Sequence, residues 1–317
     1  MKFKRLLVLL SLVTFVSGCA QIEDDSTSST SSSETTQESS TETSTDTSSS
    51  TNTDPIDPDY DFPDPTPGAV VDTGTYYDGI GNKVGDELLS ALRSLNSSKR
   101  KTTVGYSNMG TSVSGDPKDH PYMYTDYDPA TVQYDAKGQP YGTRVVSFYS
   151  GNTMTSYNKE HVWPDSHGGN KCEADIHMPR PTIPSENGSR GNSFYVEGKK
   201  DSKNGWDPAA ESFGDKTYRG DSARIIFYCM LTYTKFQLVE LDYHETSRKN
   251  NDNMMGRLST MLKWNLENPT KDREQRRNSG AEYLQGNRNP FIDHPEYACR
   301  IWGNANEAAK RICKGNY

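Results

Sequence analysis

A stretch of 48 residues near the start of the chain limits most strongly what the rest can fold into. Residues 21–68 consist mainly of serine, threonine and acidic residues, and then of Asp-Pro pairs such as Asp54-Pro55 and Asp57-Pro58. The stretch carries twelve acidic residues and no lysine or arginine. Its low apolar content and uniform negative charge leave nothing to offset the entropy of ordering, so we expect a disordered spacer. A compact core must come from residues 69–317, which we interpret as a single domain.

The residues before the spacer predict export. Three basic residues precede an apolar run of about 11 residues, which is well short of the roughly 20 that cross a bilayer. Residues 1–18 are therefore interpreted as a signal peptide. The end of the run, Val16-Ser17-Gly18-Cys19, resembles a bacterial lipobox, which would make Cys19 a lipidated first residue that holds an extracellular protein at the outer face of the membrane. An ordinary secretory signal with an incidental cysteine is the alternative.

The net charge of −8 does not argue against a polyanionic substrate. Of the 43 acidic residues, twelve lie in the spacer, and of the 35 basic residues, three lie in the leader. The remainder, with 31 acidic and 32 basic residues, is close to neutral. How charge is distributed over the folded surface therefore matters more than its sum.

Hydrophobic periodicity predicts a mixed, helix-rich α+β domain. We expect helices over residues 84–95, 221–233, 253–267 and 300–312, with the second of these central because it is strongly apolar. Strands are expected over 143–149 and 159–163, and a short helix from Pro184 should carry Asn187 on its first turns. Among the cysteines, Cys299 and Cys313 are the simplest disulfide pair, whereas Cys229 lies in an apolar run that also suits a buried free thiol.

The residues between Tyr157 and Asn192 carry the clearest chemistry. They include three histidines, several carboxylates, carboxamides and two arginines within 36 positions. This inventory suits metal-assisted attack on a phosphodiester: a neutral histidine accepts a proton from water, a carboxylate and a carboxamide hold a hard cation, and arginine contacts phosphate. For the histidine to serve as base, we expect its other nitrogen to be held by a carbonyl group.

Three motifs together resemble the bacterial endonuclease I family of secreted and periplasmic nucleases. They are the block from Glu160 to Asn192, the run Tyr218-Arg219-Gly220-Asp221, and the run from Gln285 to Glu296. The resemblance implies a ββα-metal (His-Me finger) core. It also implies an endonuclease that is largely indifferent to sequence, cleaves DNA and RNA, leaves 5′-phosphates, and uses Mg²⁺, with Mn²⁺ or Ca²⁺ as possible substitutes. We expect a monomer.

The resemblance also implies roles for individual residues. His161 would be the general base, and Glu160 and Asn187 the metal ligands. Arg190 and Asn192 belong to the same motif and are candidates for contact with phosphate or for support of the site. Where family members usually have Asp-x-His-Asn-Leu-x-Pro, this chain has Asp175-Ile176-His177-Met178-Pro179-Arg180-Pro181, and the short segment before it lacks an arginine. The resemblance therefore leaves the arginine that contacts the cleaved phosphate either missing or replaced by Arg180 or Arg190.

Several alternatives stay open at this level. Asp175 and His177 could be a structural hydrogen-bonded pair or could bind metal, and Arg288 could contact nucleic acid or simply fold its proline-rich loop. A different metallohydrolase could use Glu160, His161, Asp175 and His177 to bind zinc and cleave a small phosphate ester. A surface lipoprotein that binds a ligand without turnover is the remaining possibility.

Overall fold

The computed structural model describes residues 61–63, 71–198, 205–211, 213–240 and 252–315. All of them fall in one compact unit, Pro55–Tyr317. The predicted leader, Cys19 and almost all of the acidic spacer lie outside the described residues, so those interpretations stay predictions. In the part of the chain that is described, no helix is both long and apolar enough to span a membrane.

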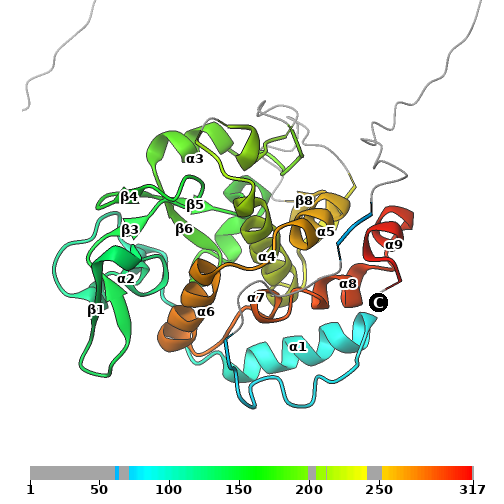
Figure 1. Ribbon diagram of the computed structural model, residues 1–317, viewed down its shortest axis with the longest axis horizontal. Helices are drawn as coiled ribbons and strands as arrows, with labels where there is room; N and C mark the ends of the chain where they lie inside the picture. Colours follow the sequence, from blue (N-terminus) through cyan, green and yellow to red (C-terminus); the bar gives the residue numbers. More distant parts are fainter. Residues whose placement is uncertain (1–60, 64–70, 199–204, 212, 241–251, 316–317) are drawn as a thin grey trace, which may run out of the picture. The chain divides into compact units, whose positions relative to one another are not determined.

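The described residues form an α+β structure that combines helices with short two-stranded sheets (Figure 1). The helices are α1 (Gly85–Lys99), α2 (Tyr122–Thr125), α3 (Pro184–Arg190), α4 (Thr217–Thr232), α5 (Leu258–Glu267), α6 (Asp272–Gln285), α7 (Pro290–Asp293), α8 (Tyr297–Trp302) and α9 (Glu307–Cys313). The antiparallel pairs are β1 (Val132–Tyr134) with β2 (Pro140–Gly142), β3 (Val145–Val146) with β4 (Thr153–Met154), and β5 (Asn158–His161) with β6 (Pro179–Thr182). Strands β7 (Gln237–Val239) and β8 (Met254–Gly256) pair in parallel.

Helix α4 is the centre of the core, as its apolar sequence predicts. Twelve of its 16 residues are buried, and it packs against α1, α5 and α7. It also buries Arg224, whose guanidinium binds the Glu274 carboxylate of α6 at 2.5 and 2.8 Å. A bidentate pair of this kind compensates both buried charges and fixes α6 to α4.

Several predicted elements are confirmed with shifted ends, and one is wrong. The first helix is α1, and the helix expected from residue 253 begins at Leu258, because residues 254–256 pair with β7 instead. The strand expected over residues 143–149 is reduced to β3. The single helix expected over 300–312 is in fact α8 and α9, since Asn306 caps a new helix by accepting a hydrogen bond from the Ala309 amide at 2.8 Å.

The disulfide predicted for the C-terminal segment is confirmed. Cys299 and Cys313 form a disulfide between α8 and α9, with their Cα atoms 5.5 Å apart. Cys172 and Cys229 are buried free thiols, and burial raises the pKa of Cys229 well above its ordinary value. Cys229 therefore lacks the thiolate character of a reactive cysteine.

Candidate functional site

Strands β5 and β6 and helix α3 form a hairpin followed directly by a helix. Glu160 lies opposite Arg180 in the antiparallel register, and His161, the last residue of β5, lies opposite Pro179. Two prolines are compatible with β6 because they alternate with Arg180 and Thr182, which retain their amide donors. Pro184 then starts α3 at a position where its missing amide costs no helical hydrogen bond.

His161 is the last residue of β5, and its side chain is partly exposed to solvent. Its side chain is 17% exposed, its Nε2 lies 3.3 Å from Oε2 of Glu173, and its ring lies 4.9 Å from that of Tyr106. Because a carboxylate only accepts hydrogen bonds, this contact places the proton on Nε2 and leaves Nδ1 as the basic nitrogen. Burial lowers the pKa of His161, which favours the neutral imidazole. The partner is a side-chain carboxylate and not the carbonyl group that we expected.

Glu160 precedes His161 but projects to the other side of β5, as the alternation of a strand requires. Only 1% of the residue is exposed. Its Oε1 accepts a hydrogen bond from the Tyr149 hydroxyl at 2.8 Å and lies 3.4 Å from Nη1 of Arg190. Its Oε2 is buried and has no hydrogen-bond partner among the described residues. Burial raises the pKa of Glu160, against the influence of Arg190 and Tyr149.

Arg190 joins α3 to the hairpin from a fully buried position. Its Nη1 and Nη2 donate to the carbonyl oxygens of His161 and Val162, each at 2.8 Å. Asn187 lies three residues earlier and therefore on the same side of α3. Its side chain is partly exposed and makes no hydrogen bond within the described residues. Asn192 lies just beyond the helix and is exposed. Arg190 thus supports the site, and Asn187 keeps its carboxamide available.

The other two candidate arginines are occupied inside the protein. Arg180 binds the Asp126 carboxylate through Nε and Nη2, at 2.9 and 2.8 Å. Arg288 is 4% exposed and donates to both carboxylate oxygens of Asp293 and to Glu282. The geometry of both favours structural roles, since each guanidinium is buried and is held by a carboxylate of the protein.

Asp175 and His177 belong to a buried polar network that also contains Tyr228, Gln285 and Asn287. The Asp175 carboxylate accepts hydrogen bonds from Tyr228 at 2.8 Å and from Gln285 at 2.7 Å. His177 Nε2 donates to the carbonyl oxygen of Asn287 at 3.0 Å, and burial lowers the pKa of His177 to about 4. This arrangement favours the structural interpretation of the pair.

The residues near β5 fit a hard divalent cation better than zinc. Glu160 has a buried carboxylate oxygen in need of a partner, and Asn187 has an available carboxamide oxygen. Two oxygen ligands with further positions left for water suit Mg²⁺. Among the described residues, no three His, Cys, Asp or Glu side chains gather as a metal site, so the zinc set of Glu160, His161, Asp175 and His177 is not assembled.

Glu173 and Tyr149 are the site residues that the sequence did not reveal. Glu173 lies in the loop between β5 and β6, twelve residues after His161, and Tyr149 comes from the turn after β3. Residues 162–178 connect β5 to β6, so the contact of Glu173 with His161 depends on how this loop folds. Nothing in the sequence around Tyr149 marks it.

Comparison with known proteins agrees with these observations. The family model for endonuclease I matches residues 85–296. The chain is 33% identical over 252 residues to a protein named extracellular ribonuclease from Bacillus amyloliquefaciens, covering 75% of this chain and 80% of that protein. It is 31% identical over 246 residues to an extracellular ribonuclease from Bacillus subtilis (strain 168), covering 73% and 79%. The chain belongs to the endonuclease I family.

Proposed function

We propose that this protein is an exported, metal-dependent endonuclease that hydrolyses phosphodiester bonds of RNA and DNA with little regard to sequence. The observation that carries the proposal is the end of β5, where a neutral histidine held by Glu173 lies beside a buried glutamate, one oxygen of which has no partner in the described part of the chain. Membership of the endonuclease I family and two relatives named extracellular ribonuclease support the reaction and the export.

His161 would act as the general base. With its proton on Nε2 and shared with Glu173, Nδ1 accepts a proton from the attacking water, and the Glu173 carboxylate then stabilises the imidazolium. Arg190 holds the carbonyl oxygens of His161 and Val162, which keeps the end of β5 in place during this step.

Glu160 and Asn187 would hold the metal, with Mg²⁺ as the natural ion and Mn²⁺ or Ca²⁺ as possible substitutes. When bound, a divalent cation supplies charge stabilisation to the phosphate and the departing 3′ oxygen, which leaves the 5′-phosphate on the product. Both Glu160 and His161 leave β5 at the same end but on opposite sides, so we place the scissile phosphate across this end of the strand.

The test is cleavage of supercoiled plasmid and of single-stranded RNA by the purified protein, measured in Mg²⁺ and in EDTA. The His161→Ala variant is measured under the same conditions. We expect Mg²⁺-dependent cleavage of both substrates that is lost in the variant. Ends that accept label from polynucleotide kinase only after phosphatase treatment would support 5′-phosphates. Absence of cleavage in any divalent metal by folded protein would contradict the proposal.

We further propose that the protein acts as a monomer tethered to the membrane through lipid on Cys19. Support comes from the lipobox-like end of the leader, Val16-Ser17-Gly18-Cys19. Cys19→Ser should move the nuclease from the cell-associated fraction to the medium without loss of activity. Equal distribution of the two forms would argue for an ordinary secretory signal.

A further inference from the structure

Two pockets on either side of the β1–β2 hairpin combine aromatic rings with unpaired cations. The first, which we call the Arg276 pocket, has a volume of about 480 Å³ and lies between α6 and the hairpin. The second, the Tyr134 pocket, has a volume of about 610 Å³ and lies between the hairpin, α6 and the segment at Asp116. Tyr124 lines both pockets, so its ring forms the wall between them.

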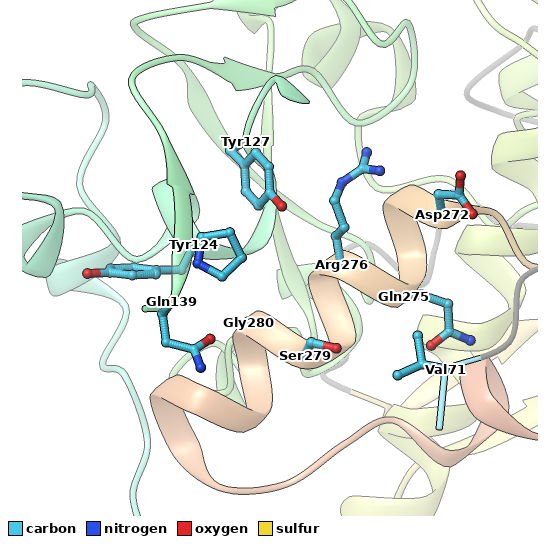
Figure 2. A pocket seen from close by; sticks show the side chains of 10 residues that line it. Val71, Tyr124, Tyr127, Gln139, Asp272, Gln275, Arg276, Ser279 and Gly280 are labelled. Atoms are coloured by element: carbon cyan, nitrogen blue, oxygen red, sulfur yellow. The ribbon is translucent and has the colours of Figure 1, made fainter. Parts of the chain in front are cut away.

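Arg276 is unusual among the arginines of the described residues because it makes neither a hydrogen bond nor an ion pair there. Its guanidinium lies 5.6 Å from the centre of the Tyr127 ring. Figure 2 shows Arg276 rising from the helix beside Tyr127, with Tyr124 and Gln139 across the pocket. Its full set of donors is therefore available to a ligand, and a planar guanidinium with free donors suits a phosphate.

The Tyr134 pocket offers flat aromatic surface in addition. Tyr134 is 68% exposed, and Tyr141 and Tyr283 are partly exposed around the same hollow. Lys137 lies 5.6 Å from the centre of the Tyr283 ring and has no carboxylate partner among the described residues. Exposed aromatic rings beside cations are the means by which proteins hold unpaired bases and the backbone that links them.

Both pockets are held in a fixed shape by Asp135. Its carboxylate accepts hydrogen bonds from the hydroxyls of Tyr283 at 2.8 Å and Tyr124 at 3.3 Å, and from the amides of Lys137 and Gln139 in the hairpin turn. Two other carboxylates line the pockets. Oδ2 of Asp116 lies 4.0 Å from Nζ of Lys118, and Asp272 is exposed at the start of α6. Arg276 and Lys137 thus remain as the cations without a carboxylate partner.

We propose that these two pockets bind a single-stranded segment of the nucleic acid substrate, with bases against Tyr134, Tyr141 and Tyr283 and a phosphate on Arg276. The inference rests on the proposed function and deepens it, because it makes single-stranded RNA or DNA the preferred substrate class. Paired bases cannot enter the pockets, so duplexes gain nothing from them.

The test is fluorescence anisotropy with labelled 30-nucleotide RNA, single-stranded or as a duplex of the same sequence, in EDTA and in a full-length His161→Ala background that prevents cleavage. In that background, Tyr134→Ala should raise the single-strand Kd about tenfold and Arg276→Gln about fivefold, whereas Tyr134→Phe should restore binding. Duplex Kd should change by no more than about twofold. Lys310→Gln removes a partly exposed charge on α9 that pairs with Glu307, and it is the control for a change of charge outside the two pockets.

An unchanged single-strand Kd in both variants would overturn the proposal, as would an equal loss for single strands and duplexes. The pockets would be assigned to carbohydrate instead if a cell-wall oligosaccharide altered the tyrosine fluorescence and Tyr134→Ala removed that change, while the variants had no effect on RNA binding. If the wild-type protein cleaves RNA while these variants bind RNA normally, the nuclease function stands without this site. If it cleaves nothing, the proposed function itself fails.

Discussion

Two histidines only 16 positions apart occupy opposite kinds of environment. His177 is 1% exposed, its Nε2 donates to a carbonyl oxygen, and the carboxylate beside it is satisfied by several donors. His161 is partly exposed and has one long contact to Glu173, and its neighbour Glu160 retains a buried oxygen that no described residue hydrogen-bonds. Buried polar groups that are fully bonded hold a fold, whereas a buried oxygen left without a partner points to a ligand.

The largest effect should come from Arg190, which serves both stability and the site. Arg190→Met should lower the free energy of unfolding by about 3–5 kcal/mol, because the buried Glu160 carboxylate loses its charge partner. Urea denaturation in EDTA measures this loss. The double variant Arg190→Met/Glu160→Gln should recover part of it, since no charge is then left uncompensated. A double variant that is less stable than Arg190→Met would contradict the assignment.

Low pH should reduce the free energy of unfolding through the His177 network. Because burial lowers the pKa of His177 to about 4 in the folded state, the unfolded chain binds a proton there first as the pH falls. The stabilisation that is present above about pH 6.5 should be lost progressively towards pH 4, up to about 3 kcal/mol. Unfolding free energies of wild type and His177→Gln, measured over pH 4.5–7.5, should show a smaller pH dependence for the variant.

His294→Gln provides the control for that experiment, because the His294 side chain is 34% exposed and lies outside the network. This variant removes a histidine and leaves the His177 network unchanged. If His177→Gln follows the wild-type curve, the buried network does not hold a neutral histidine as described.

Removal of the Glu160 charge should weaken metal binding in a protein that still folds, because Arg190 keeps its hydrogen bonds to the carbonyl oxygens of His161 and Val162. Glu160→Gln should raise the Mg²⁺ concentration needed for half-maximal activity by about 10- to 100-fold. We also expect Mg²⁺ to raise the melting temperature of the wild-type protein, and this increase should be absent from Glu160→Gln. Glu186→Gln is the matched control, since Glu186 is an equally buried glutamate that accepts a hydrogen bond from Ser147 at 2.6 Å. Identical metal dependence of the two variants would remove Glu160 from the metal site.

The smallest effect should separate the two contributions of Glu173. Glu173→Gln keeps an oxygen that accepts a hydrogen bond from Nε2 of His161 but removes the charge, so kcat should fall about threefold. Glu173→Ala removes both the hydrogen bond and the charge, so kcat should fall about tenfold. Because the Glu173 side chain is 35% exposed, solvent limits both effects. Equal rates for wild type and Glu173→Ala would show that this contact does not orient the base.

The sequence predicted the elements whose residues carry a regular apolar pattern. Helices α1 and α4 were predictable because buried leucine, isoleucine and phenylalanine recur along them. Helix α6 was missed because its buried residues include Glu274, Gln275, Arg277 and Asn278, whose burial depends on partners far along the chain. Strand β6 was missed because two of its four residues are proline.

The site was predictable only where a motif carries it. His161, Glu160, Asn187 and Arg190 follow from the family motif, and the structure brings Glu160 and Arg190 together. The contact of Glu173 with His161 depends on how the loop after β5 folds, which no periodicity encodes. The internal positions of Arg180 and Arg288 depend on Asp126 and Asp293, partners that local sequence does not reveal.

We propose that His161 performs the chemistry and that His177 holds the fold. Single-turnover cleavage of RNA and urea denaturation of His161→Ala and His177→Ala test it directly. For His161→Ala we expect a rate about 10²- to 10⁴-fold lower with stability within about 1 kcal/mol of wild type. For His177→Ala we expect a loss of about 2–4 kcal/mol, with the folded protein still cleaving RNA at close to the wild-type rate. The reverse pattern, an active His161→Ala and a stable but inactive His177→Ala, would contradict the account.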